Sequence, residues 1–158
     1  MKIGFIGLGN VGGKLAGSLI RNGVDLSVRD LNLDLVKKFT KLGAKTFSSN
    51  KELMEHCDAV ITCLPSPSAS ASVMEAENGL LEGMKPGKIW MEMSTTDQNE
   101  VIRIGKLISK KSGFAVDCPV SGGCHRADTG NIAIFAGCER KTFETILPFL
   151  KKMGRRIL

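Results

Sequence analysis

Residues 2–20, KIGFIGLGNVGGKLAGSLI, place glycines at positions 7, 9 and 12 between a short apolar run and a segment with helical spacing. The run Ile3–Ile6 predicts a buried strand, and the apolar residues beyond the glycines predict a helix. In such a strand-to-helix turn Gly7 permits a tight bend, Gly9 lets the backbone approach a pyrophosphate, and Gly12 lets the helix pack closely. The N-terminus of the helix adds unpaired N–H groups that favour phosphate. This stretch therefore predicts a dinucleotide site.

Asp30 follows the glycines by about 20 residues, at the end of the next predicted strand. A carboxylate at this position can accept hydrogen bonds from ribose hydroxyls and repels a 2'-phosphate. Leu31 cannot neutralise such a phosphate, and Arg29 should point away from the face of Asp30 because side chains alternate along a strand. The pattern favours NAD over NADP. The alternative, glycines that serve only a tight turn beside an aspartate that starts another turn, stays open.

Short apolar runs alternate with helix-period segments along the whole chain, which is typical of parallel strands joined by crossover helices. We expect strands at Ile3–Ile6, Asp25–Val28, Ala59–Cys63, Lys88–Met91, Phe114–Asp117, Ile132–Ala136 and Arg156–Leu158. Residues Ser66–Ser72 are expected to form a loop that enters a helix. The sequence thus predicts an α/β fold of the Rossmann type, with a doubly wound, mostly parallel sheet and helices on both faces. Residues 1–158 should form one dinucleotide-binding domain.

Composition is that of a globular protein, with 42% hydrophobic and 24% charged residues. No apolar run approaches the roughly 20 residues of a membrane span, and the N-terminus does not resemble a signal peptide. We therefore expect a cytoplasmic protein without a membrane partner. The five cysteines are odd in number and lack C-x-x-C spacing, which predicts reduced thiols and no metal site.

The formal net charge of +6 invites a nucleic-acid hypothesis. The lysines and arginines are nevertheless scattered over several predicted helices, where they are typical of solvated faces. We expect no nucleic-acid partner, and only a mildly favourable field for an anionic cofactor.

Three further segments follow predicted strands and are too polar or too rich in glycine and proline to be core. They are TCLPSPS at 62–68, MEMSTTD at 91–97 and DCPVSGG at 117–123. Each alone could be a helix cap or a turn. Ligands of open parallel sheets bind outside the carboxyl ends of the strands, so all three should line one crevice with the glycine-rich turn.

In this order and spacing, GFIGLGNVG, Asp30, VITCLP, MEMSTTD, DCPVSGG and ADTGNIAIFAG resemble the β-hydroxyacid dehydrogenase family. That family includes 3-hydroxyisobutyrate dehydrogenases and glyoxylate or succinic semialdehyde reductases. The resemblance implies that NAD is bound by Gly7, Leu8, Gly9, Asn10, Val11, Gly12, Asp30, Leu64, Pro65 and Thr95. It also implies that a small substrate carboxylate is held by Ser121, Gly122 and Gly123. Hydride would pass between NAD(H) and a short 3-hydroxy acid or aldehyde acid.

In the same family the proton donor is a lysine on a second, all-helical domain. No segment of these 158 residues matches its surroundings, so the resemblance implies that this chain holds no catalytic residue. We expect a cofactor domain cut from a longer enzyme, inactive alone, whose parent forms homo-oligomers through the helical domain. Val11, Glu92, Cys118 and Cys138 depart from the usual family residues, and Cys118 beside the substrate loop leaves the substrate's identity open.

Three alternatives to this interpretation stay open. One is a non-catalytic nicotinamide-binding module or scaffold. A second is 6-phosphogluconate dehydrogenase, which shares the Ser-Gly-Gly motif, although the NADP use common in that group conflicts with Asp30. A third is a thiol nucleophile formed by Cys124 and His125, although adjacent residues rarely face each other.

Overall fold

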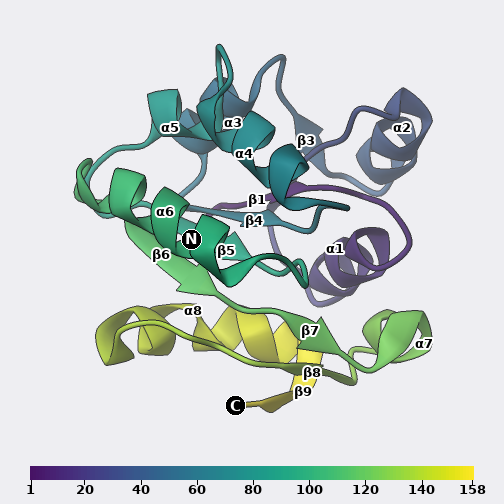
Figure 1. Cartoon of the computed structure of the whole chain (residues 1–158). Helices are drawn as coiled ribbons and strands as arrows, with labels where there is room; N and C mark the ends of the chain where they lie inside the picture. The colour runs from purple at the N-terminus through teal and green to yellow at the C-terminus, as the bar shows by residue number, and fades with distance from the viewer.

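The computed structural model describes residues 1–158 and contains two sheets. The larger one has six parallel strands in the order β3-β2-β1-β4-β5-β6 (Figure 1). Its strands are β1 Ile3–Ile6, β2 Leu26–Arg29, β3 Lys45–Thr46, β4 Ala59–Thr62, β5 Ile89–Glu92 and β6 Phe114–Asp117. Strand order reverses beside β1, and this reversal confirms the doubly wound α/β fold.

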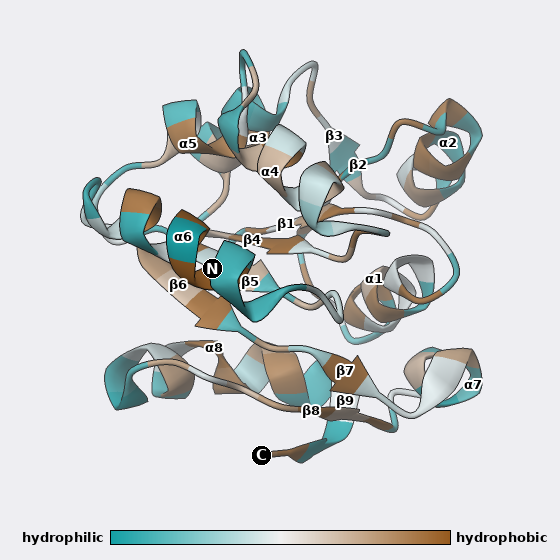
Figure 2. Ribbon diagram, in the orientation of Figure 1, coloured by the Kyte–Doolittle hydropathy of each residue, from teal (hydrophilic) through white to brown (hydrophobic).

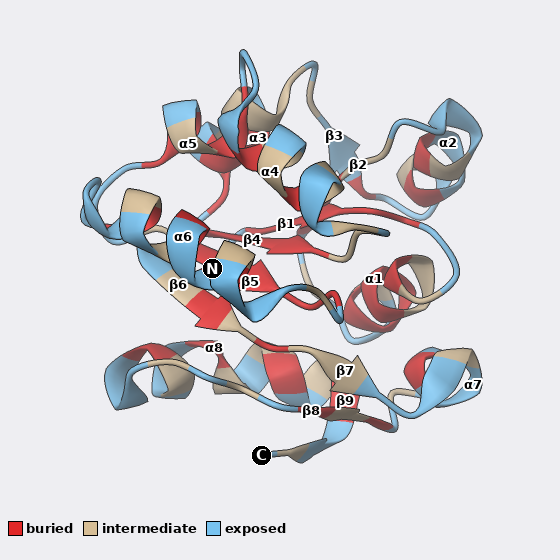
Figure 3. Ribbon diagram, in the orientation of Figure 1, coloured by how far each residue is buried: buried red, intermediate tan, exposed pale blue.

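Helices cover both faces of this sheet, and each face has its own buried apolar cluster. The first face carries α1 Gly12–Arg21, α2 Leu33–Lys41 and α8 Arg140–Met153. The second carries α3 Asn50–His56, α4 Pro67–Glu75, α5 Leu80–Gly83 and α6 Gln98–Ser109. The central strands β1, β4 and β5 are therefore mostly apolar and buried on both sides (Figures 2 and 3), with Thr62 and Glu92 as buried polar residues at the ends of β4 and β5.

The smaller sheet corrects the expectation that the last two predicted strands continue one parallel sheet. Its strands are β7 Val120–Ser121, β8 Ile132–Ile134 and β9 Gly154–Ile157, in the order β7-β8-β9. β8 and β9 pair in parallel across α8, as their alternation predicts, but β7 pairs antiparallel to β8. Alternation indicates which strands are joined by a crossover and does not indicate to which sheet they belong. The short helix α7, Gly123–Asp128, joins β7 to β8 and packs on α1.

Residues 66–72 form a helix almost throughout, which corrects the expected loop. Pro67 occupies the first turn of α4, where a missing N–H is harmless, and the side chain of Ser66 accepts a hydrogen bond from the N–H of Ala69 at 3.1 Å. The serine-rich composition that resembles a loop is therefore a helix start. No helix in the structure combines the length and apolar character needed to cross a membrane.

Candidate dinucleotide site

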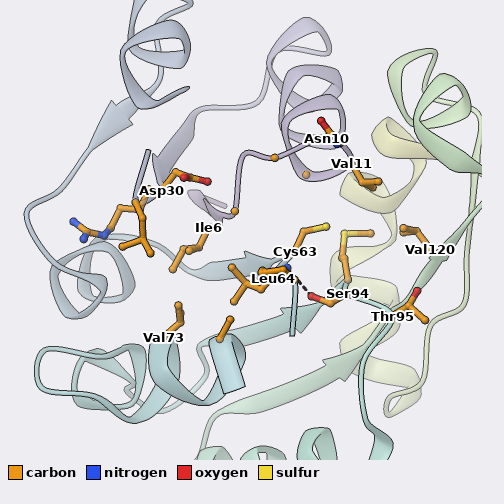
Figure 4. Close-up of a pocket in the computed structure, with 18 of the residues that line it drawn as sticks. Ile6, Asn10, Val11, Asp30, Cys63, Leu64, Val73, Ser94, Thr95 and Val120 are labelled. Carbon is orange, nitrogen blue, oxygen red and sulfur yellow. Dashed lines mark hydrogen bonds between the residues drawn. The ribbon is translucent and has the colours of Figure 1, made fainter. Parts of the chain in front are cut away.

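A pocket of about 750 Å³ lies at the carboxyl ends of the central strands, between the glycine-rich turn, α4 and the loop after β5. Ten residues predicted from the sequence line it: Gly7, Gly9, Asn10, Val11, Gly12, Asp30, Leu64, Pro65, Thr95 and Gly123. In Figure 4, Asp30 and Val73 lie at one end of the pocket, Thr95 and Val120 lie at the other, and Cys63 and Leu64 lie between them. The pocket is thus elongated along the strand ends.

Three predicted residues do not line the pocket. Leu8 is buried in the core with 2% of its surface exposed, and it takes part only through its backbone N–H. Ser121 and Gly122 are exposed in the segment just before α7, so only Gly123 of the expected carboxylate loop reaches the pocket wall. Gly122 and Gly123 both have positive φ angles, of 132° and 78°. This conformation explains the glycine pair as a turn requirement.

The glycines of the first turn differ in what surrounds them. A Cβ on Gly7 would overlap the carbonyl oxygen of Cys63, and φ at Gly7 is +96°. A Cβ on Gly12 would overlap the carbonyl oxygen of Gly7. A Cβ on Gly9, in contrast, would meet no heavy atom within 4 Å. Gly7 and Gly12 are therefore required by packing, whereas the space above Gly9 is open toward the pocket and fits a ligand that approaches the backbone.

The N-terminus of α1 has the properties of an anion site. Its N-cap, Val11, provides no side-chain hydrogen bond, and the first turn contains no acidic residue. The backbone N–H groups of Asn10 and Val11 donate no hydrogen bond within the chain. Free N–H groups and the positive end of the helix dipole suit the pyrophosphate of a dinucleotide.

Asp30 lies just beyond β2 and is tied to the glycine-rich turn. Its Oδ2 accepts a hydrogen bond from the Leu8 N–H at 2.6 Å, and its Oδ1 accepts one from the Asn32 N–H at 2.7 Å. The carboxylate thus faces the same pocket as the glycine-rich turn, and its partner Leu8 lies 22 residues earlier in the chain. Each of the two carboxylate oxygens keeps a further lone pair that can accept a hydrogen bond from a ribose hydroxyl.

Arg29 also lines this end of the pocket, a position that the sequence analysis did not assign to it. Its Nε donates to Asn50 Oδ1 at 2.9 Å, and its NH1 donates to the Phe47 carbonyl at 2.5 Å. Partial burial lowers its pKa. The guanidinium is therefore held by α3 and the segment before it, and Arg29 lines the same pocket as Asp30.

Several other pocket residues were missed by sequence reasoning, among them Asn50, Ala69, Val73, Ser94 and Val120. Ser94 belongs to the MEMSTTD segment, and its Oγ accepts a hydrogen bond from the Leu64 N–H at 2.7 Å (Figure 4). Cys63 lies in the same wall, and burial raises the pKa of its thiol to about 12. The polar segments after β4 and β5 therefore meet, as expected of strand ends at one edge.

The lining contains one carboxylate, one guanidinium, amides and hydroxyls, but no lysine or histidine. It can bind an extended ligand with a diol at one end and a diphosphate at the middle. All five cysteines are free, and no group of three or more His, Cys, Asp or Glu residues could hold a metal ion. The geometry is that of a binding site for an organic cofactor.

Comparisons with known proteins agree with this geometry. Residues 2–158 match the family described as the NAD binding domain of 6-phosphogluconate dehydrogenase. The mitochondrial 3-hydroxyisobutyrate dehydrogenase of Rattus norvegicus is 35% identical over 99% of this chain and 47% of its own length. Glyoxylate/succinic semialdehyde reductase 1 of Arabidopsis thaliana is 32% identical over 99% of this chain and 54% of its own. The chain thus spans about half the length of these curated relatives.

The solved structures include 3-hydroxyisobutyrate dehydrogenase of Mycobacterium tuberculosis, with L-serine. It superposes with a TM-score of 0.92 and 25% identity, covering 99% of this chain and 53% of that one. The match extends over both sheets, because it includes almost every residue of the chain. Together with the glycine-rich turn, Asp30 and the elongated pocket, these findings show that the chain belongs to the NAD-binding domain family of 6-phosphogluconate dehydrogenase and the related hydroxyacid dehydrogenases.

Proposed function

We propose that the chain is the cofactor domain of an oxidoreductase that transfers a hydride between NAD(H) and a short 3-hydroxy acid or the matching aldehyde acid. The observation that supports this most directly is the single pocket that joins Asp30, the open space above Gly9, and Thr95. Those groups suit, in that order, a ribose diol, a pyrophosphate and the second ribose of a dinucleotide. When bound, the nicotinamide supplies the hydride acceptor or donor.

The proposed selectivity for NAD over NADP depends on Asp30, at the end of the pocket that would hold the adenosine ribose. The carboxylate of Asp30 would repel a 2'-phosphate, and Leu31 beside it is 99% exposed and carries no charge. The nearest guanidinium, that of Arg29, is already engaged by Asn50 and Phe47. Turning it toward a 2'-phosphate would break both of these hydrogen bonds, so we expect NADH to bind more tightly than NADPH.

The substrate carboxylate is assigned to the turn of Ser121, Gly122 and Gly123. Gly123 lines the pocket, three residues after Val120, which lies at the Thr95 end, where the nicotinamide would lie (Figure 4). The exposed hydroxyl of Ser121 and the backbone N–H groups of a left-handed glycine turn are suitable donors for a carboxylate.

Hydride transfer also requires a proton donor or acceptor at the carbinol oxygen. The pocket offers no lysine or histidine, and Asp30 lies at its opposite end. We therefore propose that this proton is handled by a residue of the parent protein outside these 158 residues, and that the chain alone is inactive. The same observation favours a second candidate, a non-catalytic NAD-binding module. A parent with a lysine-bearing helical domain supports the enzyme, and a parent without that lysine supports the module.

The first experiment is calorimetric titration of the purified chain with NADH and NADPH. Binding of NADH in preference to NADPH supports the site and its selectivity. Absence of binding to either contradicts it. Steady turnover of 3-hydroxyisobutyrate by the purified chain would contradict the proposal that a residue outside these 158 residues handles the proton. The homo-oligomeric parent stays a prediction. The cytoplasmic location also stays a prediction, since the rat relative is named as mitochondrial.

A further inference from the structure

Glu92, the last residue of β5, is a carboxyl group buried beneath the pocket with none of its surface exposed. Its Oε1 accepts hydrogen bonds from the N–H of Ser94 at 2.9 Å and from the Oγ of Ser94 at 2.5 Å. Its Oε2 accepts one from Ser70 Oγ at 2.8 Å. Thr62 is its register partner on the neighbouring strand β4. One buried side chain therefore forms hydrogen bonds to two separate segments, α4 and the loop after β5.

The direction of these hydrogen bonds is fixed by their outer partners. Ser94 Oγ accepts the N–H of Leu64 at 2.7 Å, so its single proton is directed at Glu92. Thr62 Oγ1 likewise accepts the indole N–H of Trp90 at 2.9 Å. Only Ser70 is free to act as donor or acceptor toward the carboxyl. The network of Glu92, Ser94, Leu64 and Ser70 is thus satisfied with Glu92 in either protonation state.

No cationic side chain pairs with Glu92. Burial raises its pKa, while the hydroxyl and N–H donors oppose that shift. The titratable groups that interact with it are the thiols of Cys63 and Cys118, which are themselves buried. A buried acid without a counter-charge is unfavourable for stability unless hydrogen bonds compensate for its burial. The hydrogen bonds of Glu92 to Ser94 and Ser70 supply such compensation, and they also tie together the segments that carry these two serines.

Both ends of the network reach the walls of the pocket. Leu64 and Ser94 line it directly, and Ser70 lies between Ala69 and Val73, which line it from α4. Ser70 and Glu92 are 22 residues apart, and Leu64 and Ser94 are 30 residues apart. The carboxyl thus fixes the backbone after β4 against the loop after β5, and fixes α4 against both.

We propose that Glu92 is a positioning residue for the dinucleotide: through Ser94 it sets the Leu64 backbone, and through Ser70 it sets the α4 wall, before the cofactor enters. The inference rests on the proposed function, because the ligand it serves is NAD(H). A preset wall lowers the ordering cost of binding. Loss of the Glu92 carboxyl should weaken binding although Glu92 itself does not line the pocket.

The test compares Glu92→Leu, Glu92→Gln and Ser94→Ala, with the exposed Glu77→Leu as a matched control. The readouts are the Kd for NADH, the melting temperature, and the exchange rate of the Leu64 amide hydrogen without cofactor. Trp90 is the single tryptophan and the chain has no tyrosine, so energy transfer from Trp90 to NADH reports binding independently. We expect Glu92→Leu and Ser94→Ala each to weaken NADH about tenfold and to accelerate exchange at Leu64.

Glu92→Gln can still accept from Ser94 and donate to Ser70, so we expect affinity within about twofold of wild type. The double variant Glu92→Leu, Ser94→Ala should lose no more than Glu92→Leu alone, because Glu92→Leu already interrupts the connection through Ser94. A purely structural role predicts instead that losses follow melting temperature and that the two substitutions add.

Unchanged NADH affinity in folded Glu92→Leu would overturn the inference. Where Glu92→Leu does not fold, unchanged affinity of Ser94→Ala overturns it, and weakened affinity together with the Glu92→Gln rescue supports it. If wild type does not bind NADH, the proposed function fails. In that case unchanged Leu64 exchange in Ser94→Ala overturns the positioning role as well, and accelerated exchange supports it.

Discussion

Replacement of Gly9 by alanine should abolish tight cofactor binding while leaving the fold intact. A Cβ at this position meets no heavy atom within 4 Å, and Gly9 is not among the glycines with positive φ. The change in unfolding free energy should therefore stay within about 0.5 kcal/mol, as for other substitutions that create no clash. The methyl group projects into the open space that we assign to the pyrophosphate.

The expected loss of affinity follows from the distances that a methyl group and an N–H group require. An N–H donor approaches a phosphate oxygen to about 2.9 Å, whereas a carbon atom requires roughly 3.5 Å. The phosphate must then retreat from the free N–H groups of Asn10 and Val11. Loss of one hydrogen bond to a charged group costs about 1.5–3 kcal/mol, which weakens NADH about 10- to 150-fold.

Two further variants and two assays make this prediction specific. Gly105→Ala on α6 adds the same methyl group 3.5 Å from Ala115 Cβ and outside the pocket, so it should bind NADH normally. Gly7→Ala overlaps the Cys63 carbonyl and should lower the melting temperature markedly. Calorimetry measures NADH affinity, and thermal unfolding measures stability. Wild-type affinity in Gly9→Ala would refute the phosphate position, and a much lower melting temperature would refute the argument from open space.

Three other outcomes are expected. Asp30→Ala should weaken NADH more than NADPH in parallel titrations, since it removes both the ribose acceptor and the repulsion of a 2'-phosphate; equal losses would contradict its assignment. Cys63, whose pKa burial raises to about 12, should react slowly with iodoacetamide at pH 8, and more slowly still with NADH present because it lines the pocket; mass spectrometry measures both rates. Burial raises the pKa of Glu92 above its ordinary value of 4.5, so its contribution to stability is fully present below pH 4.5 and is lost as pH rises through the folded-state pKa. Urea unfolding of wild type and Glu92→Gln over a pH series should show that the free energy of unfolding of wild type falls relative to that of the variant as pH rises. Parallel curves of this free energy against pH would exclude the effect.

The parts of the fold that were predicted correctly are those determined by local sequence. The run Ile3–Ile6, the three glycines and the helix behind them lie within 20 residues, and each requirement leaves a visible residue type. The small sheet was assigned wrongly because β8 has three residues and its partners are β7 and β9, which only the folded chain identifies. Likewise residues 66–72 were assigned to a loop that enters a helix, because the apolar residues of α4 are few and its start is marked only by Ser66 and Pro67.

The same distinction between local sequence and long-range packing applies to the residues of the candidate site. Residues that would touch the cofactor through backbone or a short polar side chain, such as Gly9 and Asp30, follow strands and could be predicted from their order. Arg29, Asn50 and Val73 could not, because their placement depends on how α3 and α4 pack over the second face of the sheet. No periodicity encodes that packing.

The predicted segments are held together by hydrogen bonds between residues far apart in the sequence, which the sequence alone does not indicate. The Asp30 carboxylate restrains the Leu8 N–H across 22 residues, and Ser94 restrains the Leu64 N–H across 30. In each case a polar side chain beyond one strand fixes the backbone beyond a neighbouring strand, so the ends of parallel strands act as one rigid edge. Such an edge presents its N–H groups in place before the ligand arrives, and binding then requires little ordering of the chain. Asp30→Ala therefore removes a ribose acceptor and a restraint on the glycine-rich turn together, and the exchange rate of the Leu8 amide hydrogen without cofactor measures the loss of the restraint separately.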